Sequence, residues 1–150
     1  MERVATKTDN PQFLERFQGK FKGILRWEQL SIFWDVLLQE NDGEWYIYAV
    51  GEEPPQKTAT RTELSNFIAE VDTLLRRDHD EDYCGIVYAD NRENPSYIKI
   101  FDPNNLGLSC GSSSIKPLPG WIISRLAPTD LPNAIQQTGN RKRWWQKVFA

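Results

Sequence analysis

The sequence has few of the residues that disulfide scaffolds, metal sites and histidine-based catalysis require. Its 150 residues include two cysteines, Cys84 and Cys110, and one histidine, His79. Two cysteines are too few for a secreted disulfide framework, which favours a reducing cytoplasm. No zinc-ligand spacing, dinucleotide-binding glycine pattern or nucleophile elbow is present. We therefore expect neither a metal nor an organic cofactor.

Long apolar segments are also absent. The first ten residues, MERVATKTDN, lack the apolar stretch of a signal peptide, and runs such as IYAV are far too short to cross a membrane. The composition, 39% hydrophobic and 26% charged, is that of an ordinary soluble domain. We expect one domain spanning residues 1–150, in a cytoplasmic protein of bacterial type.

Charge is distributed unevenly along the chain. The net charge is −3, but residues 103–150 contain six Lys or Arg residues and one acid, Asp130. That segment therefore carries +5, and residues 1–102 carry −8. Such an asymmetry is typical of a chain that docks onto a partner or onto itself.

Two helices have clear start signals. Asn10 and Pro11 are suited to the N-cap and the first helical position, which predicts a helix that extends to about Phe17. Thr60 and Glu63 form a capping box in front of a second, longer helix. This helix is expected to stop by Arg77. Its apolar positions recur at helical spacing: Leu64, Phe67, Ile68, Val71, Leu74 and Leu75.

Residues 31–50 allow two interpretations. Read as a helix, this stretch would present a stripe of Trp27, Leu30, Trp34 and Leu37. Its aromatic and β-branched residues instead favour a hairpin, with strands 32–39 and 44–50 around the turn 41–43. We prefer the hairpin, and the second strand is the better supported half.

The remaining elements complete an α+β prediction. Residues 83–90 and 96–103 read as a strand pair, residues 120–126 as a short edge strand and residues 128–140 as a capped helical turn. The resulting order is α-β-β-α-β-β. It predicts an antiparallel sheet of about four strands with one main helix on a face. Residues 103–150 would form a proline- and glycine-rich basic segment docked on the same domain.

The segment DPNNLGLSCGSSS raises the possibility of thiol chemistry. Gly111 and Ser112 offer amides and a hydroxyl beside Cys110 that could activate the thiol or bind an anion. His79 would have to be the base, and Asp102 could orient it.

A structural interpretation of the same segment is better supported. His79 stands among four acids that favour a solvated side chain, and no helix opens after the serines to form a phosphate cradle. Asn104 and Asn105 readily cap their own backbone in a turn. The acidic run 78–82 lacks the calcium-loop pattern, so we interpret it as exposed surface.

The C-terminal segment is the stronger candidate for function. Tryptophan and arginine dominate protein interfaces, and they are clustered here with a lysine. The predicted contact residues are Trp121, Arg141, Arg143, Trp144, Trp145 and Lys147. We expect another protein as the partner, with nucleic acid unlikely because the body is acidic, and weak peripheral membrane contact possible. The function predicted is that of a small binding or accessory protein whose contact surface comprises the loop 103–121 and the C-terminal Trp/Arg tail. The alternative is a thiol-dependent enzyme or anion site at Cys110.

Overall fold

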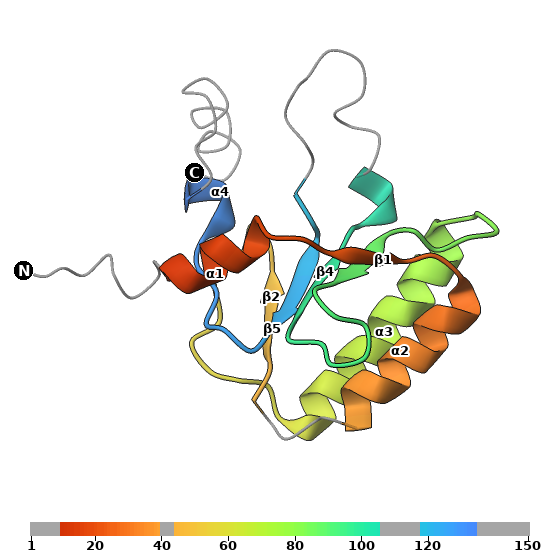
Figure 1. Cartoon of the computed structure of the whole chain (residues 1–150), viewed down its shortest axis with the longest axis horizontal. Coiled ribbons are helices and arrows are strands. Elements are labelled where there is room, and N and C mark those ends of the chain that lie inside the picture. The colour runs from red at the N-terminus through yellow and green to blue at the C-terminus, as the bar shows by residue number, and fades with distance from the viewer. Residues whose placement is uncertain (1–9, 40–43, 106–117, 135–150) are drawn as a thin grey trace, which may run out of the picture.

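The computed structural model describes residues 10–39, 44–105 and 118–134, and in them the chain forms an α+β fold built on one antiparallel sheet (Figure 1). The sheet has five strands in the order β1-β3-β4-β5-β2. Their bounds are β1 Lys22–Ile24, β2 Tyr46–Ala49, β3 Val87–Ala89, β4 Tyr97–Ile100 and β5 Trp121–Ser124. The helices are α1 Pro11–Phe17, α2 Trp27–Gln39, α3 Arg61–Asp78, the 3₁₀ turn η2 Pro103–Asn105 and α4 Leu131–Ala134.

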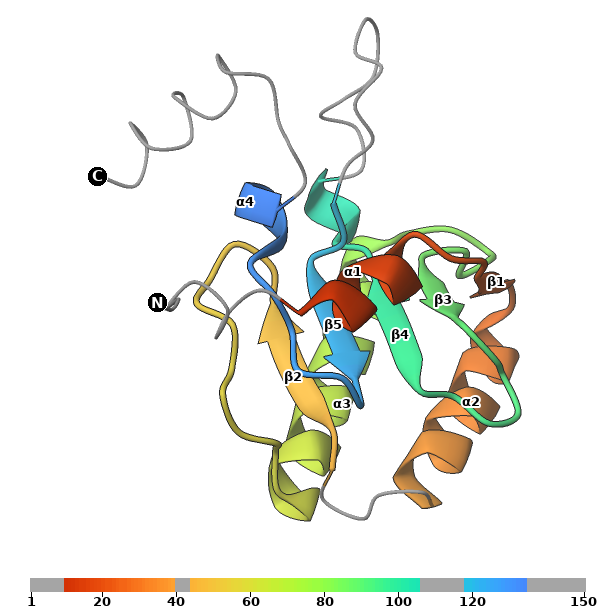
Figure 2. The same ribbon diagram turned by 60° about the vertical axis from the view of Figure 1, so that its left-hand side comes forward.

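The described elements confirm the α+β class and the antiparallel sheet, but their order differs from the prediction. It is α-β-α-β-α-β-β-β, with η2 between the last two strands and α4 at the end. Helices α2 and α3 lie together on one face of the sheet, and α1 lies on the opposite face (Figure 2). The sheet is therefore covered on both faces, rather than by one main helix on a single face.

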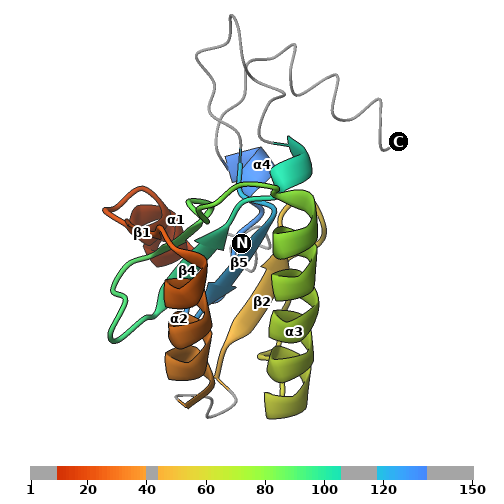
Figure 3. The same ribbon diagram turned by 90° about the vertical axis from the view of Figure 1, so that its right-hand side faces the viewer.

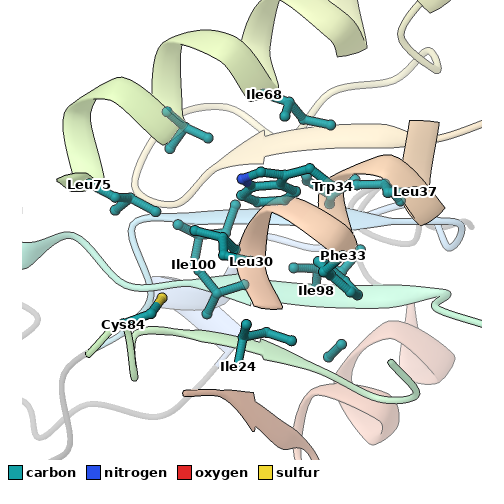
Figure 4. Packing of buried hydrophobic residues seen from close by; sticks show 14 of the residues in the cluster. Ile24, Leu30, Phe33, Trp34, Leu37, Ile68, Leu75, Cys84, Ile98 and Ile100 are labelled. Atoms are coloured by element: carbon teal, nitrogen blue, oxygen red, sulfur yellow. The ribbon is translucent and has the colours of Figure 1, made fainter. Parts of the chain in front are cut away.

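Residues 32–39 are helical, so the predicted first strand of the hairpin is wrong. They belong to α2, which is buried along Leu30, Phe33, Trp34 and Leu37. These positions recur every three or four residues, as the helical interpretation required. Figure 4 shows them directed at sheet residues such as Ile98. The strand propensity of the aromatic residues is overridden because a helix places all four on the core side.

The capping predictions are confirmed. The side chain of Asn10 accepts a hydrogen bond from the Gln12 amide, with proline at the first position of α1. At α3, the Glu63 amide donates to the Thr60 hydroxyl, and the Thr60 amide donates to the Glu63 carboxylate. Helix α3 ends at Asp78, one residue after the predicted stop.

Two strand assignments are corrected by the pairing. Strand β5 was predicted at an edge but lies between β4 and β2, with Ile123 opposite both Ile98 and Ile47. Strand β2 confirms the predicted 44–50 strand, although its partner is β5. Strand β1 was not predicted, because Lys22 and Gly23 give no strand signal. Its pairing with β3 makes it a strand.

A smaller cluster covers the other face of the sheet. Phe13 of α1 packs against the rings of Tyr48 and Tyr97, with centroids 6.3 and 5.1 Å away. Ile122 and Leu131 complete this cluster, and all five side chains are buried. Helix α1 therefore contributes to a second core despite being only seven residues long.

Helices α2 and α3 run side by side on the sheet (Figure 3) and are joined by polar contacts. The Asp72 carboxylate accepts hydrogen bonds from the Trp34 indole at 3.1 Å and from Arg76 Nε at 3.0 Å. Arg76 also donates to the Trp27 carbonyl and the Ser31 hydroxyl, and its guanidinium lies 5.1 Å from the centre of the Trp27 ring. One arginine–aspartate pair thus links three positions of α2 to α3. No helix in the described residues is long and apolar enough to span a membrane.

Replacing Asp72 with alanine is expected to lower the free energy of unfolding by about 1–3 kcal/mol, because the buried Trp34 indole N–H loses its acceptor. Urea unfolding monitored by tryptophan fluorescence measures the change. Glu70→Ala, at an exposed position of the same helix, controls for the helix propensity of alanine. Equal stabilities of the two variants would contradict the prediction.

Candidate functional site

Several predicted site residues gather at one end of the sheet. Ile100, the last residue of β4, pairs with Trp121, the first residue of β5. The turn η2 follows β4 directly and contacts the end of α3. Helix α4 lies at this same end (Figure 1). We call this region the η2 end, defined by Asp78, Asp102, Asn104, Gly120 and Trp121.

Helix α4 is held near the η2 end by a tyrosine of β2. The Leu131 amide donates a hydrogen bond of 3.1 Å to the hydroxyl oxygen of Tyr48. Tyr48 is buried, and burial raises the pKa of its hydroxyl to about 12, so the hydroxyl stays neutral at physiological pH. The start of the C-terminal segment is therefore fixed to the sheet. Residues 135–150 lie outside the described residues.

Asn104 connects the segment after β4 to the end of α3. Its side-chain amide donates to the Asp78 carboxylate at 3.0 Å, and its backbone amide donates to Asp102 Oδ1 at 2.9 Å. Arg77 also donates to Asp78 at 2.8 Å. These hydrogen bonds, first that from Arg77 and then that from Asn104, lower the pKa of Asp78 to about 2. The predicted self-capping is wrong for Asn104, because the turn is capped by the Asp102 carboxylate and the Asn104 side chain is bonded to Asp78 instead.

A close backbone approach fixes where the chain returns to the sheet. A Cβ added to Gly120 would lie 3.1 Å from Cβ of Asp102. The Gly120 amide donates to the Ile100 carbonyl at 2.9 Å, and its own carbonyl accepts from Val50. Glycine at 120 thus lets the segment that follows β4 pass close to the segment that precedes β5.

His79 takes part in an aromatic contact rather than in a catalytic arrangement with Asp102. Its ring packs edge-on against Trp27 and Tyr83, with centroids 6.1 and 5.9 Å away. Its Nε2 atom is buried and has no hydrogen-bond partner among the described residues. No hydrogen bond joins His79 to Asp102 in the part of the chain that the structure describes. Cys110, Gly111 and Ser112 lie outside the described residues, so the thiol hypothesis remains a prediction.

The predicted contact residues are divided between described and undescribed parts of the chain. Trp121 is partly buried, and its ring packs against Phe67 of α3 at a centroid distance of 6.5 Å. Asn105 ends η2. The others lie outside the described residues: Arg141, Arg143, Trp144, Trp145 and Lys147. Trp121 is thus an anchor shared with the core, and the tail residues remain a prediction.

Sequence reasoning missed the role of Asp78. An acid at a helix C-terminus opposes the helix dipole, and on this ground the sequence predicts that the helix stops by Arg77. The same conflict could have indicated a partner for the carboxylate, which the structure supplies in Arg77 and Asn104. Within residues 10–39, 44–105 and 118–134, no group of three or more His, Cys, Asp or Glu side chains is placed to hold a metal ion.

Replacing Asn104 with alanine is expected to raise the pKa of the Asp78 carboxyl above about 2, because one of its hydrogen-bond donors is lost. Arg77→Gln is expected to raise this pKa further, since Arg77 is the larger cause. Carboxyl carbon shifts followed by NMR from pH 1.5 to 6 measure both variants. The native interaction favours the folded state above the unfolded pKa and is lost as pH falls toward 2. An unchanged midpoint in both variants would contradict the arrangement.

No family model matches the sequence, and neither the curated proteins nor the solved structures show significant similarity to the chain. A function for this protein must therefore be argued from its own residues.

Proposed function

We propose that the protein is a small binding or accessory protein that acts through contacts with another protein made at the η2 end. The observation that carries the proposal is the convergence of the two predicted contact segments. The first leaves the described fold at Asn105 and returns at Leu118, and the second leaves it at Ala134. Turn η2, which contains Asn105, and helix α4, which contains Ala134, lie at the same end of the sheet (Figure 1).

The rigidity of the η2 end supports this role. Both departure points are fixed by hydrogen bonds, at Asn104 to α3 and at Leu131 to Tyr48. Interfaces gain affinity when the contact residues are held in place before binding, because less conformational entropy is lost. Two segments rich in serine, arginine and tryptophan that are attached at such fixed points suit a recognition surface.

Charge supports a protein partner over a nucleic acid or a membrane. Residues 103–150 carry +5 against −8 in the rest of the chain. An acidic body repels phosphate backbones and anionic headgroups, whereas a protein surface can offer acidic groups to the tail and neutral groups to the body. The same complementarity would let the tail rest on residues 78–82 when no partner is present.

The alternative, a thiol-dependent site at Cys110, has less support. The chain has a single histidine, and its Nε2 is buried beside Trp27 and Tyr83. A general base must reach the proton that it abstracts, and such a position makes His79 a poor base.

The proposal is tested with the full chain carrying Trp144→Ala and Trp145→Ala. Proteins crosslinked to the wild type in its native cells and identified by mass spectrometry are compared with those of the variant. We expect at least one specific partner to be lost, with a direct Kd at least tenfold weaker when both proteins are purified, as for hot-spot tryptophans. The control is Ile32→Ala, which removes an exposed apolar side chain of α2 outside the η2 end and is expected to keep every partner.

Two outcomes would overturn the proposal. One is an identical set of partners for wild type and the double tryptophan variant. The other is alkylation of Cys110 by iodoacetamide at neutral pH far faster than that of free cysteine, because this would show the activated thiol of the alternative function.

A further inference from the structure

The two edge strands of the sheet, β2 and β1, differ in whether another segment of the chain lies beside them. Residues 52–59 run beside β2, where the Ala59 amide donates to the Trp45 carbonyl at 2.7 Å and Pro54 is buried. Strand β1 at the other edge pairs only with β3 in the described structure. It lies at the margin of the sheet in Figure 2. Half of its backbone donors and acceptors therefore face outward without a neighbouring strand.

The open edge carries cations that have no described partner. Lys20, Lys22 and Arg26 are all exposed. None of the three forms an ion pair with a residue that the structure describes, in contrast to Arg16, which pairs with Asp90 at 3.0 Å. Residues 10–26 together carry +3, although the first two thirds of the chain are acidic.

One of these cations opposes local stability. Arg26 precedes α2, and its carbonyl accepts the first helical hydrogen bond, from the Leu30 amide. A positive charge is unfavourable at this end of a helix because of the helix dipole. A residue that breaks a local rule without a structural gain points to a role in binding.

The side chains around β1 include a glycine under an aromatic ring and an exposed leucine. Gly23 has no side chain, and the Tyr88 ring of β3 lies over it, 3.1 Å from the position a Cβ would take. Leu25, just beyond the strand, is 61% exposed. Because side chains alternate along a strand, Lys22 projects on the face of Ile24, and Gly23 and Leu25 lie toward the face of Tyr88.

From this edge we infer a second interaction surface: β1 binds an extended acidic peptide segment of another protein by adding it to the sheet as a sixth strand. The main chain of the peptide pairs with the outer side of β1. Acidic side chains at alternate positions meet Lys22 and Arg26, and the apolar side chains between them pack on Leu25 and the Tyr88 ring.

The same charges exclude a second copy of this chain as the occupant. Pairing two copies of so short a strand would bring Lys22 and Arg26 of both chains close together along one edge, and like charges on paired strands are destabilising. An acidic strand removes this repulsion. The surface is separate from the η2 end, so it stands or fails independently of the proposed function.

The probe is an acetylated and amidated peptide of alternating glutamate and valine, about six residues long as in a typical strand. Added to the ¹⁵N-labelled full chain, it is expected to shift the amide signals of residues 20–26 and 87–89 and to slow hydrogen exchange in β1. Affinity falls with salt, because the charges are exposed. The chain with Trp144→Ala and Trp145→Ala binds the probe equally well.

Charge reversal separates this surface from general electrostatics. Lys22→Glu combined with Arg26→Glu is expected to weaken binding of the probe about tenfold, as two exposed pairs are lost, and to allow binding of the corresponding lysine–valine peptide. Lys57→Glu, an exposed lysine beside the covered edge, serves as the control and leaves binding unchanged. Thermal unfolding verifies that each variant folds.

Three results would overturn the inference. The first is the absence of shifts at β1 with the glutamate–valine probe at millimolar concentration. The second is equal weakening by Lys57→Glu. The third is tighter binding of a single-stranded oligonucleotide or of anionic lipid vesicles at the same residues, which would assign the edge to another class of anion.

Discussion

The burial of β4 on both faces is the constraint on which the rest of the fold depends. Ile98 and Ile100 face the core beneath α2 and α3, while Tyr97 and Lys99 face α1. The lysine is tolerated there because its ammonium donates to the Phe17 carbonyl at 2.7 Å and lies 4.1 Å from the Phe17 and Phe21 rings. A partly buried cation is stabilised by such partners. Helix α1 and the residues just after it thus supply partners for the lysine of β4.

The same strand gives the η2 end its geometry. The turn at Asn104 is close to α3 because β4 ends beneath the C-terminus of that helix, and Trp121 pairs with Ile100 across the sheet. The position of the proposed contact surface is therefore set by β4, which is buried on both faces of the sheet. The open edge at β1 lies two strands from β4 and has none of this covering, which suits it to a weaker and reversible partner.

The parts that could be predicted from the sequence are those with local causes. The capping residues Asn10 and Thr60, and the β3–β4 hairpin, have signals within a few residues. The helix at 27–39 and the strand at 22–24 could not be separated from alternatives, since propensity is weak and distant pairing decides. For the site, Asp102 and Asn104 were placed near α3 by contacts between residues far apart in sequence, and such contacts leave no local pattern.

The attachment of α1 also sets an order of events during synthesis. Its hydrogen-bond partners lie far along the chain. Arg16 donates to Asp90, 74 residues away. The Phe13 and Phe17 carbonyls accept from Tyr97 and Lys99, at separations of 84 and 82 residues. Because these partners are synthesised after α1, the helix must wait for them before it can pack on the sheet. Until then Phe13 has no core to enter, and long-range contacts of this kind slow folding. Helix α1 is thus synthesised well before the strands that hold it in place.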